Sequence, residues 1–271
     1  MRHPERRMLI CVDMERYSGR GNVQQYEAQQ DFHRVLRETA EEVGLRREDW
    51  RTQQSGDGEL AILPRELPEA HLIGRFVPEL NRRLRRYNAS RLPAARIRLR
   101  IAVHQGMVHL DGANGFPGQA VVLVSRLCDA APVRRALAAF PDAGIALVVS
   151  SDIYRDVVTE YPEQIRPDRF KRIDVRIPDK QFQAQGWLCV VDEDVASWVG
   201  DESPEVSGGV SEPRLEEERR GGYPAYRAPD PVAGGIRTGD IRVDGQNAVG
   251  HGAMAIGSVG RDVHLRPGTD R

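Results

Sequence analysis

The stretch RTQQSGDGELAIL, residues 51–63, contains the clearest local signal for the fold. Its GDG sequence, residues 56–58, predicts a tight hairpin turn, because glycines beside an aspartate tolerate positive φ. The apolar run at residues 60–63 has strand length and ends at Pro64. The stretch therefore predicts a hairpin with Asp57 at its tip. Taken alone, that acid is interpreted as a turn residue.

A second acid, Asp13, changes that interpretation. It follows MLICV, residues 8–12, a continuous apolar run typical of a strand buried on both faces. An acid at the end of such a strand is costly unless a cation compensates it. A glycine-containing loop and a helix over residues 23–43 come next, and the free N–H groups at the helix start would suit phosphate oxygens. If the first strand lies beside the hairpin, Asp13 and Asp57 converge on one metal-binding pocket.

Hydrophobic periodicity predicts the remaining elements of the domain. Apolar residues recur at helical spacing over residues 69–87. Residues 96–103 alternate between arginine and aliphatic side chains, which indicates a strand with one solvent-facing side. The run Ser150, Ser151 and Asp152 is expected to cap a helix that follows a buried strand and extends to about Val158. Further elements are expected at residues 119–130 (helix) and at 145–149, 170–177 and 186–191 (strands).

Composition and charge restrict the class of protein. The formal net charge of the 271-residue chain is −1, so bulk charge favours neither nucleic-acid nor membrane binding. Cys11, Cys128 and Cys189 are isolated and lack the spacing of a zinc site or a disulfide framework. No apolar run is long enough to span a bilayer, and the N-terminus has no signal-peptide core. We therefore expect a cytoplasmic protein with reduced thiols.

The chain divides by composition into three parts. Residues 7–192 have the periodicity of a folded domain, and residues 193–235 combine Gly, Pro, Ser, Glu and Arg without it, as in a flexible linker. Residues 236–265 alternate glycines with small or β-prone residues and contain the pair Gln246 and Asn247. This tail resembles the short amyloid signalling motifs of bacterial defence proteins, which assemble as cross-β. The alternative is a disordered Gly-rich tail with a marginal hairpin.

Several of these stretches, taken together, resemble the class III adenylyl and guanylyl cyclases. Their order and spacing also match that family over roughly residues 7–192. The resemblance implies an α+β fold with a ferredoxin-like βαββαβ core and added elements. The matching stretches are VDMERYS (12–18), QSGDGELAI (54–62), IRLRIAVHQGMV (97–108), GQAVVLVSRL (118–127) and LVVSSDIY (147–154).

The resemblance also implies a catalytic set. Asp13 and Asp57 match the two aspartates that bind two ions, Mg²⁺ or Mn²⁺, and the backbone carbonyl of Met14 matches a further ligand. Arg126 matches the arginine that steadies charge on the transferring phosphate, for which a permanent forked cation is suited. In this family each site takes its aspartates from one chain and its arginine from the other, so a head-to-tail homodimer is expected.

Other family positions differ in this chain. Val122 stands where the family has an asparagine that orients the ribose, and Gln53 replaces the base-selecting lysine. The second base-selecting position falls near Gly115 in an ungapped alignment. Lys180 or Arg176 would replace the lysine that binds the triphosphate. Since the Gln53 amide can both donate and accept, it is compatible with several bases, and the base stays open.

Three functional hypotheses follow from these matches and departures. The first is an active cyclase that converts a nucleoside triphosphate to a 3′,5′-cyclic nucleotide in bacterial signalling or antiphage defence, with a pyrimidine nucleotide as one candidate substrate. The second is a cyclase-homology domain that binds a nucleotide or a partner without turnover and signals through assembly of the tail. The third is a structural homologue whose acids hold a structural ion. No nucleic-acid partner is expected.

Overall fold

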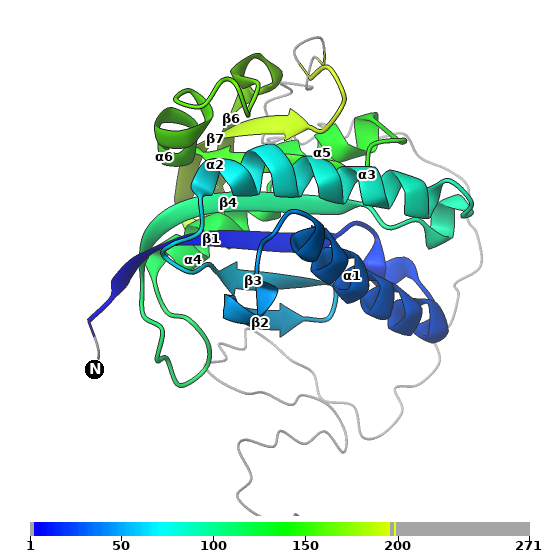
Figure 1. Cartoon of the computed structure of the whole chain (residues 1–271), viewed down its shortest axis with the longest axis horizontal. Helices are drawn as coiled ribbons and strands as arrows, with labels where there is room; N and C mark the ends of the chain where they lie inside the picture. Colours follow the sequence, from blue (N-terminus) through cyan, green and yellow to red (C-terminus); the bar gives the residue numbers. More distant parts are fainter. Residues whose placement is uncertain (1–2, 196–197, 199–271) are drawn as a thin grey trace, which may run out of the picture. The chain divides into compact units, whose positions relative to one another are not determined.

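The computed structural model describes residues 3–195 and 198 as an α+β domain around one seven-stranded sheet (Figure 1). The strand order across the sheet is β2-β3-β1-β4-β5-β7-β6. The strands are β1 (Glu5–Met14), β2 (Arg51–Ser55), β3 (Gly58–Ile62), β4 (Leu99–Val108), β5 (Ile145–Ser150), β6 (Lys171–Ile177) and β7 (Phe182–Val190). The α-helices are α1 (Asn22–Glu42), α2 (Glu69–His71), α3 (Val77–Asn88), α4 (Gln119–Cys128), α5 (Ala131–Ala139) and α6 (Ser151–Ile153).

The first four strands form the expected ferredoxin-like core. Along the chain, β1, α1, β2, β3, α3 and β4 make a βαββαβ unit, and in space its strands are ordered β2-β3-β1-β4 with every pair antiparallel. Strand β5 is then added parallel to β4, and β7 and β6 extend the sheet as an antiparallel pair. The predicted fold class is therefore confirmed by the order and direction of the strands.

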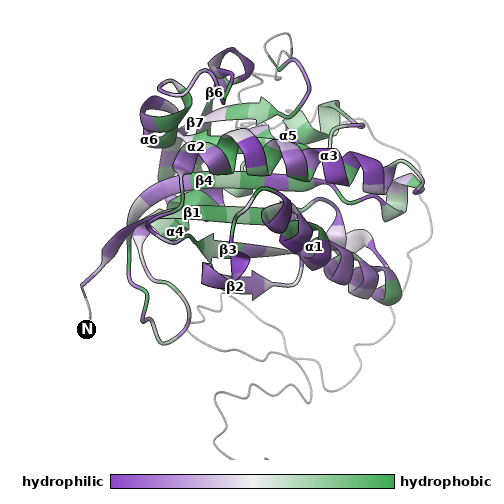
Figure 2. Ribbon diagram, in the orientation of Figure 1, coloured by the Kyte–Doolittle hydropathy of each residue, from purple (hydrophilic) through white to green (hydrophobic). Residues whose placement is uncertain are grey.

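Helices cover both faces of the sheet, and each face has its own hydrophobic core. Helices α1 and α3 lie over one face, where they bury the stripes that contain Phe32, Leu36 and Leu80. Helices α4 and α5 cover the opposite face (Figure 1). Figure 2 shows that the outward surfaces of α1 and α3 are hydrophilic, whereas the central strands are hydrophobic. Burial of two faces explains why the sequence of β1 is nearly continuous in apolar residues.

The helix predicted over residues 69–87 is present with one irregularity. Helices α2 and α3 are joined without a break by a π-helical turn, Leu72–Phe76.

A second π-helical turn, Tyr154–Val158, extends α6. Ser150 caps α6 by accepting a hydrogen bond from the Ile153 N–H. The sequence predicted a cap within residues 150–152, and the structure assigns it to Ser150. Helix α5 was not predicted.

The hairpin turn forms where expected, but for a different physical reason. Neither Gly56 nor Gly58 has a left-handed φ. Glycine is required at 58 because a Cβ there would collide with the backbone oxygen of Val12 on the neighbouring strand, whereas a Cβ at 56 would make only an ordinary contact with Tyr17. The predicted tolerance of positive φ was therefore not what this turn uses.

The arginines of β4 and the loop before it do not face solvent as predicted. The side chains of Arg98 and Arg100 are only 14% and 13% exposed. The prediction was wrong because the side of β4 that carries these residues is covered by α4 and α5, so the guanidinium groups find partners inside the domain. Arg98 donates to the carbonyl oxygens of Ala143 (3.0 Å), Phe140 (3.1 Å) and Leu137.

The expected tail, residues 236–265, lies outside the described residues, as does nearly all of the expected linker, 193–235. Within the part of the chain that is described, no helix combines the length and the apolar character needed to cross a membrane.

Candidate active site

Three strands bring the two candidate aspartates together. In the ladders around β1, Asp13 is opposite Gly58 of β3 on one side and Arg100 of β4 on the other. The backbone N–H of Met14 donates to the carbonyl oxygen of Asp57 (2.8 Å), which holds the hairpin tip against the end of β1. The convergence of Asp13 and Asp57 that was predicted from the sequence therefore follows from strand pairing.

A cation not singled out in the sequence, Arg100, completes this cluster. Its guanidinium donates to the carboxylate of Asp13 and lies 3.9 Å from that of Asp129. The Nε atom of Arg100 is buried and has no hydrogen-bond partner among the described residues. A signal for this residue did exist, because the acid at the end of a buried strand required a cation. The alternating arginine side chains of residues 96–103 were instead expected to face solvent.

The surroundings of Asp13 favour its protonated form. Burial raises the pKa of Asp13, and the negative charges of Asp57 and Asp129 act in the same direction. The hydrogen bond and the positive charge of Arg100 oppose this rise in pKa. An added cation would reverse the balance, since it favours the ionised carboxylate.

A pocket of about 320 Å³ opens beside Asp13, between the β2–β3 hairpin and α4. It contains the predicted residue Gln53 and two hydroxyl side chains, Ser55 and Ser125. Its volume is near the lower end of the range for small-molecule sites. The lining consists of Cys11, Val12, Asp13, Gln53, Ser55, Glu59, Leu60, Val121, Ser125, Cys128 and Asp129.

The two positions that the resemblance assigned to base recognition are in contact. Gly115 has φ +99°, a conformation that favours glycine, and a Cβ on it would collide with the side-chain amide of Gln53. The loop that contains Gly115 therefore lies directly against the side chain of Gln53. Residues at these two positions can act on the same ligand.

Arg126 and Lys180 lie away from the pocket beside Asp13 in the same chain. The guanidinium carbon of Arg126 is 4.6 Å from the ring centroid of Phe182, at the start of β7, and Arg126 does not line the pocket beside Asp13. Lys180 is exposed in the turn between β6 and β7. Arg126 therefore faces the β6–β7 hairpin, whereas Asp13 and Asp57 lie at the β1–β3 end of the site.

The donors near Asp13 suit hard divalent cations in type but are few in number. Carboxylate and carbonyl oxygens are the ligands that Mg²⁺ and Mn²⁺ prefer. Among residues 3–195 and 198, however, no group of three or more His, Cys, Asp or Glu side chains is arranged to hold a metal. A cation at Asp13 and Asp57 would also have to share Asp13 with Arg100. The site therefore fits ions that receive further oxygen ligands from a substrate.

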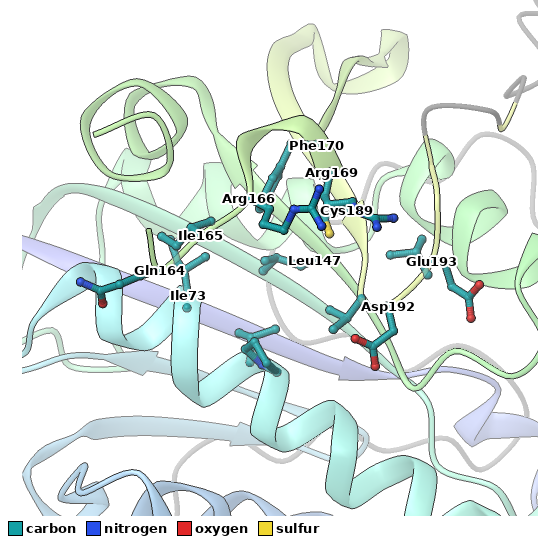
Figure 3. A pocket seen from close by; sticks show the side chains of 15 residues that line it. Ile73, Leu147, Gln164, Ile165, Arg166, Arg169, Phe170, Cys189, Asp192 and Glu193 are labelled. Atoms are coloured by element: carbon teal, nitrogen blue, oxygen red, sulfur yellow. The ribbon is translucent and has the colours of Figure 1, made fainter. Parts of the chain in front are cut away.

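A separate cavity of about 270 Å³ lies on the α3 side of the sheet (Figure 3). Its floor is apolar, with Ile73, Leu147 and Phe170, and Arg166 and Arg169 stand at its edge near Cys189. Burial raises the pKa of the Cys189 thiol to about 12, which keeps it protonated and unreactive at neutral pH. This cavity lies on the opposite face of the sheet from Asp13, and none of its lining residues belongs to the cluster of Asp13, Asp57 and Arg100.

Comparison with known proteins gave matches only among solved structures. No family model and no curated protein matches the chain. An adenylate/guanylate cyclase/hydrolase from Silicibacter pomeroyi is 19% identical, with 70% of this chain and 99% of that one covered and a TM-score of 0.48. The guanylyl cyclase Cya2 is 14% identical over 70% and 96% (TM-score 0.45), and a bacterial light-regulated adenylyl cyclase is 11% identical over 69% and 90% (TM-score 0.46). These matched structures are adenylyl and guanylyl cyclases, the family that the sequence motifs of this chain resemble.

Proposed function

We propose that this chain is a nucleotidyl cyclase that converts a nucleoside triphosphate into a 3′,5′-cyclic nucleotide and pyrophosphate. The observation that carries the proposal is the convergence of Asp13, Asp57 and Arg100 beside a pocket that contains Gln53. In the reaction, the ribose 3′-oxygen forms a bond to the α-phosphorus and loses its proton. The bond from the α-phosphorus to the oxygen that bridges to the β-phosphorus breaks, and pyrophosphate leaves with that electron pair.

The acidic end of the site holds and orients the reacting groups. Asp13 and Asp57, with the carbonyl oxygen of Met14, would bind two divalent cations, Mg²⁺ or Mn²⁺. When bound, these ions favour the ionised 3′-oxygen and neutralise the triphosphate. Arg100 lies next to Asp13 with an unused Nε–H, so it is placed to donate to a phosphate oxygen. It also keeps the charge of Asp13 compensated before the substrate arrives.

The other side of the substrate is assigned to Gln53, Lys180 and Arg126. Gln53, held against Gly115, would recognise the base through its amide. Lys180 would bind the triphosphate. Arg126 would stabilise charge on the transferring phosphate in a second copy of the chain, because it lies away from Asp13 in its own chain. The active form is accordingly a homodimer with shared sites.

The test is incubation of the purified full chain with each of the four nucleoside triphosphates and Mg²⁺ or Mn²⁺, followed by mass spectrometry for cyclic monophosphates. We expect slow turnover, since the missing ribose contact at Val122 corresponds to a loss of about a hundredfold to a thousandfold in rate. Asp57→Asn should abolish product formation, whereas Arg86→Gln, on the exposed side of α3, should not change it. Absence of a cyclic product with every triphosphate and both metals would contradict the proposal.

A second candidate function is nucleotide binding without turnover. It is favoured by Val122 and by the ion pair that already occupies Asp13. In that case one triphosphate should raise the melting temperature of the wild-type domain, but not of Asp57→Asn, while no product forms. We also propose that either form acts in bacterial signalling or antiphage defence, with the tail at residues 236–265 as an assembly motif. The support for this role is the alternating Gly-rich sequence of the tail.

A further inference from the structure

The cavity of about 270 Å³ on the α3 side of the sheet, shown in Figure 3, has no role in the proposed reaction. We call it the α3-side cavity. Its walls come from the continuous helix of α2 and α3, from β5, from the loop of residues 164–170 and from the end of β7. Its volume is near the lower end of the range for small-molecule sites. The cavity therefore has the size of a site for a small molecule.

The floor of the α3-side cavity is apolar. Ile73 and Val77 of the helix, Leu147 of β5, Phe170 of the loop and Val191 at the end of β7 all line it. All of them except Phe170 also belong to the buried core on this side of the sheet. An apolar ligand group placed against these side chains would be removed from water and would gain dispersion contacts. The floor therefore favours a ligand with a hydrocarbon body.

The wall that the helix contributes is fixed by close packing. Gly74 lines the cavity and belongs to the π-helical turn Leu72–Phe76, a kind of turn that is frequent at functional sites. A Cβ on Gly74 would lie 2.8 Å from the backbone oxygen of Gln164 and 3.2 Å from the side chain of Ile165, so glycine is what lets the loop approach the helix this closely. The helix and the loop therefore hold this wall in place without a ligand.

Two arginines stand at one end of the cavity, and they differ in their partners (Figure 3). Arg166 donates to the carboxylate of Asp168 (2.7 Å), which does not line the cavity. The hydrogen bond from Arg166 lowers the pKa of Asp168 more than the charge of Arg169 does. Arg169 forms no ion pair with an acid among the described residues, and its charge opposes the rise in the pKa of the Cys189 thiol that burial causes. Arg169 therefore places at the cavity a cation that no described acid contacts directly.

The two acids that line the cavity do not compensate Arg169. Asp192 accepts a hydrogen bond from Asn81 (2.8 Å) and pairs with Arg85 (3.3 Å), neither of which lines the cavity. Figure 3 shows Asp192 and Glu193 at the end of β7, away from the two arginines. The positive charge of the cavity is thus separated from its negative charge.

These features limit the chemistry of the ligand. A guanidinium group matches the two oxygens of a carboxylate in geometry and charge. One such group without an acid at contact distance suits a single negative charge, whereas a phosphate with two charges would need Arg166 to leave Asp168. The apolar floor adds a place for a hydrocarbon chain. The ligand that fits is an anion with one carboxylate and an apolar body.

We propose that the α3-side cavity binds a monocarboxylate with a compact hydrocarbon body, whose carboxylate accepts hydrogen bonds from Arg169. The ligand would contact the helix, β5 and the end of β7 together, so its binding should also raise the melting temperature of the domain. This site is independent of the proposed function, since binding there requires no nucleotide, no metal and no turnover.

Isothermal titration calorimetry on the full chain at neutral pH tests this site, with octanoate as the probe. Octanoate should bind with a Kd below about 1 mM. The alcohol 1-octanol has the same chain without the charge and should bind at least about tenfold more weakly, the factor expected from loss of one charge-assisted hydrogen bond. Each methylene removed from octanoate should weaken binding about fourfold, because the floor buries that group.

Variants of the lining locate the site. Arg169→Gln should weaken octanoate binding about tenfold and leave 1-octanol binding unchanged, a difference that a general loss of structure would not produce. Arg172→Gln, at an exposed residue of β6 outside the cavity, is the matched control and should bind both probes as the wild type does. Cys189→Phe places a ring in the cavity and should abolish binding of both probes. Thermal unfolding without ligand verifies that each variant folds.

The outcomes separate this proposal from the proposed function. Asp57→Asn should lose cyclase activity and still bind octanoate as the wild type does. The proposal is overturned if octanoate does not bind, if 1-octanol binds as tightly as octanoate, if octylammonium binds more tightly, or if Arg169→Gln leaves the affinity for octanoate unchanged. Arg169 is only partly buried, so this variant remains informative even if Cys189→Phe does not fold.

Discussion

Arg100 donates a hydrogen bond to the carboxylate of Asp13 across the antiparallel pair β1 and β4, where the two residues are direct partners in the ladder. The pair joins residues that are 87 positions apart in the chain. The candidate metal ligands on β1 are the carboxylate of Asp13 and the backbone carbonyl of Met14. The pair places the Asp13 carboxylate next to a fixed positive charge. The relationship therefore links the stability of the central strands to the chemistry proposed for the site.

Removing Arg100 should destabilise the domain. Arg100→Met would leave Asp13 half-buried without its cation, at a cost of about 1.5–3 kcal/mol in the free energy of unfolding. Urea denaturation of the wild type and the variant at neutral pH measures this change. Adding Asp13→Asn should recover part of the loss, because the uncompensated charge is then gone. Arg86→Met is the control. An equal loss of stability in this variant would contradict a specific contribution of the Arg100–Asp13 ion pair.

The two glycines of the hairpin should differ in their tolerance of alanine. Gly58→Ala places a Cβ against the backbone oxygen of Val12, which cannot move without disturbing the ladder between β1 and β3. We expect a loss of about 1–3 kcal/mol or more. At Gly56 the nearest atom would be a Tyr17 ring carbon at 3.7 Å, so Gly56→Ala should change stability by only about 0.5 kcal/mol. Thermal unfolding that ranks the two variants equally would contradict this reason for glycine at 58.

Shared sites predict complementation between two inactive variants. Asp57→Asn removes a proposed metal ligand and Arg126→Ala removes a cation that faces the β6–β7 hairpin. If each site combines residues from two chains, mixed dimers contain one intact site, and an equimolar mixture should regain about a quarter of the wild-type activity. Cyclic nucleotide formation after unfolding and refolding the mixture is the measurement. A mixture no more active than either variant alone would exclude sharing between chains.

Acid should destabilise the domain through His104. This side chain is buried, its Nδ1 lies 2.9 Å from the Ser150 hydroxyl, and burial lowers its pKa from 6.5. The unfolded chain therefore binds a proton at a higher pH than the folded domain does. The resulting stability is complete above pH 6.5 and is lost as the pH falls through the lowered pKa, by up to about 1.4 kcal/mol per pH unit.

The pH dependence of urea unfolding between pH 8 and pH 5 measures this effect. His104→Gln should remove this component of the slope, whereas His3→Gln, at an exposed residue, should retain it. The same slope in both variants would assign the acid sensitivity to other groups.

The tail should contribute nothing to the stability of the domain and should assemble by itself. Deleting residues 236–265 should leave the melting temperature of the domain unchanged. A peptide of the same residues should form thioflavin-positive fibrils with cross-β spacings, because its low charge and alternating pattern suit stacked strands. A scrambled peptide of equal composition is the control. A monomeric, unstructured peptide at high concentration would exclude the assembly motif and leave the cyclase proposal unaffected.

Much of the architecture could be predicted from short stretches of the sequence. Periods of two and 3.6 residues identified the β2–β3 hairpin, α1 and the core positions of α3, because burial of one side of an element leaves its spacing in the sequence. The acids Asp13 and Asp57 could be proposed as neighbours, since each stands at the end of a predicted strand or turn. These inferences depend only on residues close together in the chain.

The partners of those acids were decided by tertiary structure. The sequence of β4 shows arginines alternating with aliphatic residues, and that pattern is the same whether the arginines face water or a helix. Only the packing of α4 and α5 over that face turned Arg100 toward Asp13 and Arg98 toward the end of α5. Contacts between Gln53 and Gly115, and between Arg126 and Phe182, likewise join distant segments. Such pairs depend on which faces meet, and a local pattern does not contain that information.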